Sequence, residues 1–443
     1  MMKKYFLSII LTTVALSASA LDFTGTPEAV MTVRPDAQTG LNEIYVVRSS
    51  RGVKVSYTAA STGTVKWYRY GTNGAAYAEE IKDVVVSGKV STITLGTDDS
   101  GYVIEEGAVP RYYWIVNYEN HIFEATALTT AEADCQSVVL DFRGSAAPVN
   151  FYGINGRRHE LSRELDVSYY TLVYDEESES FVQTLATDEI ESVEHSVRVN
   201  APLCDTHFTL TGDRFLKFWN SDISVESDNF KATAVDAHTA VTQETRENDN
   251  EQKVEAGGLG GSAPCDITFR AAVTDAAVFH EWQMSQTPDF DVIDDRYTEL
   301  EFSYTFRNQG TTYVRFMAAN ADASCDWYSD SYEVFIGESK LECPNAFSPQ
   351  TSPGVNDEWK VSYKSIISFE CHIFNTWGLE MTSFKDPSMG WDGKYKGKYV
   401  PAGVYYYVIN AVGSDGRKYK LSGDINIIGS SKNNNTSSTP ETE

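Results

Sequence analysis

The side chains that could carry catalytic chemistry are scattered along the chain. The seven histidines show no metal-ligand spacing with another histidine or a cysteine, except that His372 directly follows Cys371. Neighbouring residues of a strand point to opposite faces, so this pair cannot readily converge on one metal ion. The chain also lacks the G-x-S-x-G, H-E-x-x-H, Walker-type and Rossmann fingerprints. We therefore predict that the protein is not an enzyme and binds no cofactor.

The 63 Asp and Glu residues supply many carboxylates but no recognisable site. A glycosidase needs two carboxyl groups flanking the scissile bond, and any such pair here would be an arbitrary choice. Calcium needs several oxygens converging from one loop, and the nearest runs are residues 98–101 and 320–322. Asp, Asn and Gly are favoured in turns for backbone reasons. We interpret both runs as turns and predict no metal site.

The chain is strongly acidic, with a formal net charge of -27 at pH 7. Such a chain repels nucleic-acid phosphates, so we predict no nucleic-acid partner. The acidity indicates either an affinity for divalent cations or a solvated, self-repelling surface, and we favour the surface. Residues 343–428 differ from the rest, because they hold nine Lys and Arg against eight Asp and Glu.

The N-terminus predicts export. Lys3 and Lys4 precede an apolar run over residues 5–16 and a small-x-small site at residues 18–20, which is the layout of a secretory signal peptide. We therefore predict a signal peptide over residues 1–20. No later run approaches the roughly 20 apolar residues of a membrane-spanning helix.

The cysteines favour disulfides, because their number is even and the chain is predicted to be exported. Connectivity does not follow from sequence. The simplest hypothesis pairs them in order, with one bridge per module: Cys135 with Cys204, Cys265 with Cys325, and Cys343 with Cys371. The alternative for Cys371 is a buried, small hydrophobic residue.

Short segments of alternating apolar and polar residues, separated by Gly, Asn, Asp and Ser, run along most of the chain. They predict an all-β protein of tandem Ig-like β-sandwich domains. We place sandwiches at residues 21–130, 131–235 and 263–338, a small C-terminal β-sandwich at 341–429, and a disordered tail at 430–443. Residues 236–262 are polar, charged and Gly-rich, and we interpret them as a flexible linker.

Two clusters have both a functional and a structural interpretation. Trp67, Tyr68 and Tyr70 could form a sugar-stacking platform, but alternation puts Trp67 and Tyr68 on opposite faces, so we favour core packing of Trp67. The second cluster could bind an anion or form a charged connection across a sandwich end, and we favour the connection. Its residues are Arg157, Arg158, His159 and Arg163.

Residues 263–338 resemble the PKD family of Ig-like sandwiches of bacterial surfaces. The resemblance rests on the opening strand SAPCDITFRA, on Trp282 in the third-strand position, and on the later GTTYVRFMAANADASC. It implies a spacer or a module for protein and carbohydrate contacts.

The stretch from residue 343 to 428 holds several short motifs in a fixed order. Phe369, Cys371 and Ile373 alternate toward one face of a strand. Turns are expected at residues 376–378, 391–393 and 401–403. In the first turn, glycine can take φ > 0 and the preceding tryptophan, Trp377, can fold back over the core. These features predict a compact sandwich.

This stretch resembles the gliding-motility-associated C-terminal domain, the type B sorting signal of the type IX secretion system in Bacteroidetes. The matching motifs are PNAFSP, GVNDEW, IFNTWG, WDG, PAGVYYYVI and LSG, in the order of the family. The motif residues of this chain are Pro344, Asn345, Phe347, Asn356, Asp357, Trp359, Asn375, Trp377, Gly378, Trp391, Asp392, Gly393, Pro401, Gly403, Tyr405 and Tyr406. Residues 350–353 replace the NGDG of the family, and residues 430–443 extend beyond its usual end.

The resemblance implies an export route through the periplasm to the cell surface or the medium. The implied partners are the type IX secretion translocon and an outer-membrane partner protein. We hypothesise an adhesin- or stalk-like protein whose upstream modules contact a surface glycan or a protein ligand. Two alternatives stay open: a surface polysaccharide-binding protein, suggested by 55 aromatic residues, and a structural component of the secretion or gliding machinery.

Overall fold

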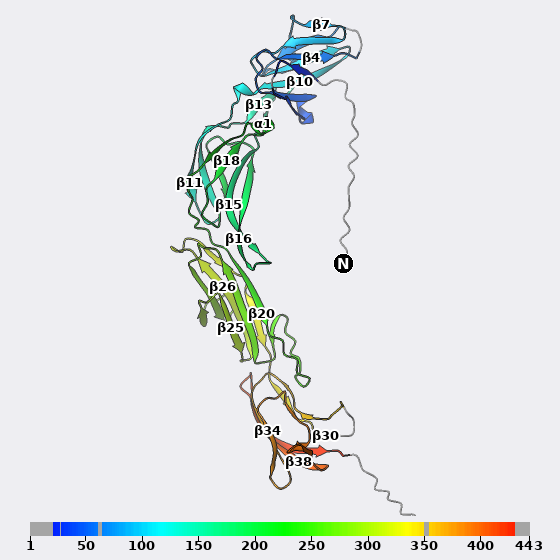
Figure 1. Cartoon of the computed structure of the whole chain (residues 1–443), viewed down its shortest axis with the longest axis vertical. Coiled ribbons are helices and arrows are strands. Elements are labelled where there is room, and N and C mark those ends of the chain that lie inside the picture. Colours follow the sequence, from blue (N-terminus) through cyan, green and yellow to red (C-terminus); the bar gives the residue numbers. More distant parts are fainter. Residues whose placement is uncertain (1–20, 27, 61–63, 350–353, 430–443) are drawn as a thin grey trace, which may run out of the picture. The chain divides into compact units, whose positions relative to one another are not determined.

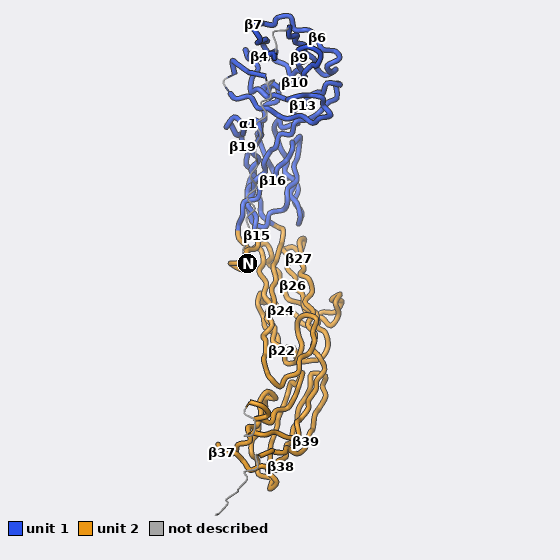
Figure 2. Tube along the Cα trace, turned by 90° about the vertical axis from the view of Figure 1, so that its right-hand side faces the viewer, with its two compact units in different colours: residues 1–173, 183–232 blue, residues 174–182, 233–443 orange. Residues whose placement is uncertain are grey.

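The computed structural model describes residues 21–26, 28–60, 64–349 and 354–429. The predicted signal peptide, the polar tail and residues 350–353 lie outside this part of the chain. Strands make up nearly all of its regular structure, which confirms the all-β prediction. They form two compact units, residues 1–173 with 183–232 (unit 1) and residues 174–182 with 233–443 (unit 2) (Figure 2). Among the described residues, no helix is long and apolar enough to cross a membrane.

The first sandwich of unit 1 is built from two sheets. Its elements are β1 (Asp22–Thr24), β2 (Met31–Val33), η1 (Ala37–Thr39), β3 (Glu43–Val47), β4 (Lys54–Thr58), β5 (Lys66–Tyr70), η2 (Ala75–Tyr77), β6 (Glu79–Glu80), β7 (Val85–Ser87), β8 (Val90–Thr94), β9 (Ser100–Glu106), β10 (Val109–Asn117) and η3 (Tyr118–Asn120). The sheet orders are β1-β4-β8-β7 and β2-β3-β10-β9-β5-β6. Trp67 of β5 is fully buried, and its Nε1 donates to Ser91 Oγ of β8 at 2.9 Å. The core interpretation of Trp67 is therefore confirmed.

The second sandwich of unit 1 begins at β11. Its elements are β11 (Glu124–Ala133), β12 (Ser137–Ser145), β13 (Val149–Tyr152), β14 (Arg158–Leu161), β15 (Leu165–Asp175), β16 (Ser180–Ile190), β17 (Ser196–Asn200), β18 (Thr209–Gly212), α1 (Arg214–Phe218) and β19 (Ile223–Glu226). The sheet orders are β11-β12-β17 and β16-β15-β18-β19, and β13 and β14 form a hairpin. Residues 124–130 were predicted to end the first sandwich, and this is wrong because β11 pairs with β12 along its length.

A buried ion pair joins the segment after β14 to the start of α1. Arg163 Nη1 lies 2.5 Å from Asp213 Oδ2, and the two side chains are 2% and 0% exposed. Tyr118 Oη donates to Asp213, and Arg163 Nη2 donates to the carbonyl of His121 at 2.8 Å. One hydrophobic cluster runs through both sandwiches of unit 1. Arg163 is therefore buried and ion-paired on the connection between β14 and β15. Arg158 and His159 instead belong to the paired strand β14, so the interpretation as a connection fits Arg163 and not the whole cluster.

The third sandwich belongs to unit 2. Its strands are β20 (Ala237–Gln243), β21 (Leu259–Gly261), β22 (Cys265–Val273), β23 (Phe279–Ser285), β24 (Asp295–Tyr297), β25 (Glu301–Phe306), β26 (Gly310–Ala319), β27 (Asp326–Tyr328) and β28 (Tyr332–Ile336). The sheet orders are β20-β22-β25 and β21-β28-β26-β23-β24, and β27 pairs with β26. The flexible linker predicted at residues 236–262 is wrong, because β20 pairs with β22 and β21 pairs with β28. Trp282 of β23 is fully buried in this core.

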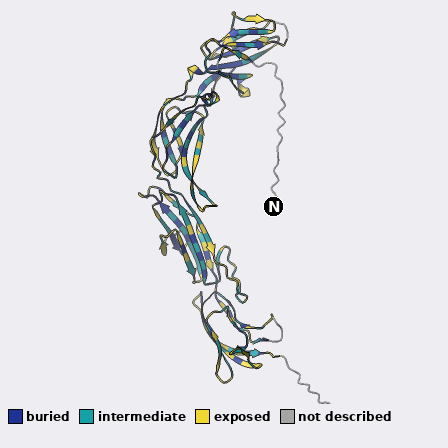
Figure 3. Cartoon of the chain, in the orientation of Figure 1, coloured by how far each residue is buried: buried dark blue, intermediate teal, exposed yellow. Residues whose placement is uncertain are grey.

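The C-terminal domain is a small sandwich with its own core. Its strands are β29 (Lys340–Glu342), β30 (Ala346–Phe347), β31 (Trp359–Lys360), β32 (Ser362–Lys364), β33 (Ile366–Phe374), β34 (Glu380–Phe384), β35 (Gly390–Trp391), β36 (Lys394–Tyr395), β37 (Lys398–Tyr399), β38 (Gly403–Gly413) and β39 (Lys418–Ile427) (Figure 1). The main sheet has the order β30-β39-β38-β33-β34, and β29-β32, β31-β35 and β36-β37 pair separately. Buried and more exposed residues alternate along its strands (Figure 3).

The cysteine pairing differs from the prediction. Cys135 and Cys325 are disulfide-bonded, whereas Cys204, Cys265, Cys343 and Cys371 carry thiols. The in-order pairing is therefore wrong in all three bridges. Cys371 is fully buried in the middle of β33, where it packs as a small hydrophobic residue. Burial raises the pKa of the Cys371 thiol to about 12.

Candidate functional site

The first motif of the C-terminal domain builds the edge of the main sheet. The carbonyl of Asn345 accepts hydrogen bonds from the backbone N and from Nδ2 of Asn426, at 2.9 and 3.1 Å. Phe347 of β30 is buried, and its ring centroid lies 5.6 Å from that of Trp391. The carbonyl of Pro344 accepts from Trp359 Nε1 at 2.7 Å. These three motif residues therefore hold β30 against the core.

The second motif, which follows residues 350–353 in the sequence, forms a turn. Asn356 has φ 55°, and its carbonyl accepts from Ser348 N at 2.8 Å. The carboxylate of Asp357 accepts from Gly354 N. Its other oxygen, Oδ1, is buried and has no partner among the described residues. The backbone of Asn356 and the carboxylate of Asp357 thus shape a loop.

Two motif tryptophans face each other in the core. Trp359 and Trp391 pair across β31 and β35, and both are buried. Trp391 Nε1 donates to the carbonyl of Lys394 at 2.9 Å. Asp392 Oδ1 accepts from Lys394 N at 3.0 Å, and Oδ2 lies 2.7 Å from Lys394 Nζ. Gly393 follows with φ 74°, which suits glycine in this tight turn.

The fifth motif starts the long strand β38. Gly403 is its first residue, with φ 152°. Tyr405 is buried, packs edge-on against Trp391 with centroids 5.1 Å apart, and donates from Oη to the carbonyl of Pro401 at 3.0 Å. Pro401, Gly403 and Tyr405 therefore serve the fold. Tyr406, the next residue, points out of the core and is exposed.

The third motif forms a hydrogen-bonded turn that exposes one large side chain to solvent. Asn375 Oδ1 accepts from the backbone N of Trp377 at 2.9 Å and of Leu379 at 3.0 Å, and Gly378 takes φ 77°. Trp377 itself is 90% exposed. The expectation that Trp377 folds back over the core is wrong, because the turn between β33 and β34 carries the ring beyond the end of the sheet.

A row of apolar side chains is exposed on the neighbouring strand β38. On β38, Val404, Tyr406 and Val408 alternate outward and are exposed, while Tyr405 and Ile409 point into the core. Tyr406 lies opposite Phe374, the last residue of β33, so it sits at the end of the sheet from which the Trp377 turn leaves. We call Val404, Tyr406, Val408 and Trp377 the outer face.

The sequence contained a signal for the outer face. The run VYYYVI is apolar at consecutive positions, whereas a strand with one solvated face alternates. On β38 the outward-pointing side chains are also apolar, and they are exposed. Exposed apolar patches of this kind mark interaction sites more often than single exposed residues do. Among the motif residues, Trp377 and Tyr406 are thus the large hydrophobic side chains that the structure exposes, and the aromatic rings of the other motif residues are buried in the fold.

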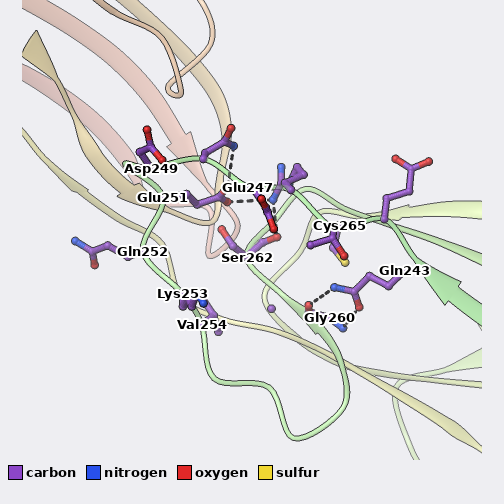
Figure 4. Close-up of a pocket in the computed structure, with 15 residues that line it drawn as sticks. Gln243, Glu247, Asp249, Glu251, Gln252, Lys253, Val254, Gly260, Ser262 and Cys265 are labelled. Carbon is purple, nitrogen blue, oxygen red and sulfur yellow. Dashed lines mark hydrogen bonds and ion pairs between the residues drawn. The ribbon is translucent and has the colours of Figure 1, made fainter. Parts of the chain in front are cut away.

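A pocket of about 470 Å³ lies elsewhere in unit 2, under the segment between β20 and β21 (Figure 4). Its lining includes Glu247, Asp249, Glu251 and the buried thiol of Cys265. Burial raises the pKa of Cys265 to about 11, so this thiol is a poor nucleophile. No group of three His, Cys, Asp or Glu among the described residues could hold a metal ion. The pocket offers no catalytic arrangement.

Comparison with known proteins assigns two parts of the chain. Residues 127–227 match the model of a fibronectin type III domain, and residues 341–427 match the CHU_C type IX secretion signal domain. The chain thus carries a type IX secretion signal domain at its C-terminus and a fibronectin type III or Ig-like domain upstream, which confirms the predicted resemblance. No curated protein matches the chain.

Similar solved structures include strings of tandem domains. A tetra-tandem repeat from the extending region of a large adhesion protein is 12% identical, covering 86% of this chain and 96% of that one with a TM-score of 0.21. A tandem of titin domains is 13% identical, covering 64% and 92% with a TM-score of 0.16. Dimeric latent PorU from Porphyromonas gingivalis is 9% identical, covering 72% and 35% with a TM-score of 0.16. TM-scores this low carry no argument about function.

Proposed function

We propose that this is a non-enzymatic, adhesin- or stalk-like protein that the type IX secretion system carries to the cell surface or the medium. The proposal rests on the match of residues 341–427 to a type IX secretion signal domain. That match covers the small sandwich from Leu341, the second residue of β29, to the end of β39. A signal peptide at residues 1–20 would bring the chain to the periplasm, where this domain folds and is recognised.

The outer face is the surface that we propose the export machinery contacts. All eight tryptophans lie among the described residues, and Trp377 is the exposed one. The hydrogen bonds of Asn375 fix its turn without using the ring. Trp and Tyr are enriched among the residues that dominate the energetics of protein interfaces, so the exposed rings of Trp377 and Tyr406 suit a protein partner. The translocon and its outer-membrane partner protein are that partner in our proposal.

The upstream sandwiches fit the role of a stalk. The two sandwiches of unit 1 share one hydrophobic core cluster, a second cluster fills the first sandwich, and the Arg163–Asp213 pair is buried in the second. Such a core favours a stiff pair of domains over a flexible string. The polysaccharide-binding alternative loses its clearest platform, because the ring of Trp67 is buried.

Deletion of residues 343–443 tests the export proposal. Cells producing the full chain or the deleted chain are treated with protease while intact, and the surviving protein is quantified after fractionation. We expect the full chain to be digested from outside and the deleted chain to stay protected in the periplasm. Surface digestion of the deleted chain to the level of the full chain would refute the proposal.

A further inference from the structure

The segment between β20 and β21, residues 244–258, leaves the third sandwich and lies along the C-terminal domain. We call it the strap. It runs parallel to β32: Tyr363 N donates to the carbonyl of Asn250 at 3.1 Å, and Gln252 N donates to the carbonyl of Tyr363 at 2.6 Å. Because β32 pairs with β29 on its other side, the strap adds one parallel bridge, at Glu251, to the remaining edge of β32.

Amide side chains of the strap reinforce this pairing. Asn250 Nδ2 donates to the carbonyls of Val361 and Pro387, at 2.8 Å each. Gln252 Nε2 donates to Ser362 Oγ at 2.7 Å, and Asn248 Nδ2 donates to Tyr363 Oη at 3.1 Å. The bonds of Asn250 satisfy two main-chain carbonyls of the C-terminal domain, and those of Gln252 and Asn248 hold side chains of β32.

Tyr363 is the residue that the strap covers. Its side chain is 3% exposed, and it belongs to the core cluster of the C-terminal domain. Burial, reinforced by the nearby charge of Glu251, raises the pKa of Tyr363 to about 12. Glu251, which lies outside the matched range 341–427, therefore contributes to the environment of Tyr363, a core residue inside that range.

Both ends of the strap are fixed by the third sandwich. Gln243, the last residue of β20, donates from Nε2 to the carbonyl of Gly260 at 2.8 Å and accepts from Gly260 N at 2.8 Å. Arg246 Nη2 donates to the carbonyl of Ser262 at 2.9 Å and to Glu251 at 3.1 Å. Figure 4 shows the strap curving over the pocket between these anchors.

We infer that the strap is part of the export signal, so that the signal is complete only after the third sandwich has folded. A loop held at both ends loses little further entropy on docking, whereas the same residues in an unfolded chain dock at a low effective concentration. Folding of β20, β21 and β22 thus brings the strap to β32. The inference rests on the proposed function, since it names a further part of the recognised domain.

Hydrogen exchange of the purified full chain tests the docking. Asn250→Asp removes both side-chain donors and sets a carboxylate against two carbonyls, so we expect the Tyr363 amide to exchange at least about tenfold faster. Asp249→Asn is the matched control, because Asp249 is the exposed neighbour in the same segment, and its exchange should equal that of the unaltered chain. Unchanged exchange in Asn250→Asp would overturn the inference.

A second pair of variants tests the dependence on the third sandwich. Trp282→Ala opens a cavity in its core, whereas Trp67→Ala opens one in the first sandwich, and both side chains are fully buried. We expect faster exchange of the Tyr363 amide in Trp282→Ala and no change in Trp67→Ala. Equal exchange at Tyr363 in the two variants would overturn the inference.

Surface display separates this inference from the proposed function. If the strap belongs to the signal, Asn250→Asp lowers the protease-accessible fraction on intact cells several-fold, and Asp249→Asn leaves it unchanged. Full display of Asn250→Asp, with the Tyr363 amide exchanging faster, overturns the inference alone. Display of the chain that lacks residues 343–443 overturns the proposed function instead.

Discussion

Trp359 and Trp391 lie directly opposite each other in the two-stranded sheet of β31 and β35. Each indole N–H donates to a main-chain carbonyl, that of Pro344 at 2.7 Å and that of Lys394 at 2.9 Å. The pair therefore brings the motifs GVNDEW and WDG together in the core of the C-terminal domain. These two motif residues therefore serve the fold of the C-terminal domain.

The first prediction concerns this pair. Trp359→Ala removes a fully buried ring and its hydrogen bond, so the free energy of opening of the C-terminal domain should fall by about 3–5 kcal/mol. Hydrogen exchange of the amides of β33 in the full chain measures this quantity. Trp391→Ala should lower it by a similar amount. A change below about 0.5 kcal/mol, the usual range of a neutral surface substitution, would contradict the packing described for the pair.

The second prediction concerns the buried ion pair of unit 1. Asp213→Asn keeps the side-chain acceptor for Leu216 N, which Asp213 bonds at 3.0 Å, but leaves Arg163 without a counter-charge. Breaking such a buried pair is expected to lower the free energy of unfolding by about 3–5 kcal/mol. Chemical denaturation of the full chain measures this loss, and hydrogen exchange of the amides in β12 and β18 shows whether it lies in the second sandwich.

A matched exposed pair serves as its control. Arg158 and Glu160 lie 3.6 Å apart, with side chains 64% and 50% exposed. Arg158→Ala should change the free energy of unfolding by less than about 1 kcal/mol, because solvent screens such pairs. Equal effects of Asp213→Asn and Arg158→Ala would show that the Arg163–Asp213 pair is not shielded from water.

The third prediction concerns thiol reactivity. Burial raises the pKa of Cys265 to about 11 and of Cys371 to about 12, so both thiols are neutral in the folded chain near pH 8. Alkylation needs the thiolate, and native labelling should therefore be slow until the pH approaches these values. Unfolding should expose both thiols to labelling at once. Rapid native labelling near pH 8, or disulfide-linked peptides containing either cysteine, would contradict this environment.

Sequence patterns predicted the cores better than the partners of each strand. Trp67 was placed inside its sandwich because residues of a strand alternate between faces, and Trp282 through the resemblance to the PKD family; both are fully buried. Residues 124–130 were assigned to the wrong sandwich, since alternation identifies a strand but not the strand that pairs with it. The predicted pairing of the cysteines failed for the same reason, because a sequence pattern does not show which strands are neighbours. Cys371, for example, is buried in the middle of β33.

The strap shows where composition misleads. Residues 244–258 are polar and Gly-rich, which is also the composition of a flexible linker. Their Asn and Gln side chains instead bond main-chain carbonyls and hydroxyls of another domain. No local pattern distinguishes an amide that water solvates from one that a distant carbonyl accepts. The outer face was partly visible, because the run VYYYVI is apolar on both faces of its strand.

The most decisive measurement is the protease-accessible fraction of Trp377→Ala on intact cells. Trp377 is 90% exposed and supports no described core contact, so this variant should keep the hydrogen exchange of the unaltered C-terminal domain. We expect its surface display to fall about tenfold, the effect of losing roughly 1.4 kcal/mol of binding free energy. Tyr77→Ala, which removes a 73% exposed ring from the first sandwich, should be displayed normally. Normal display of Trp377→Ala would contradict recognition through the outer face.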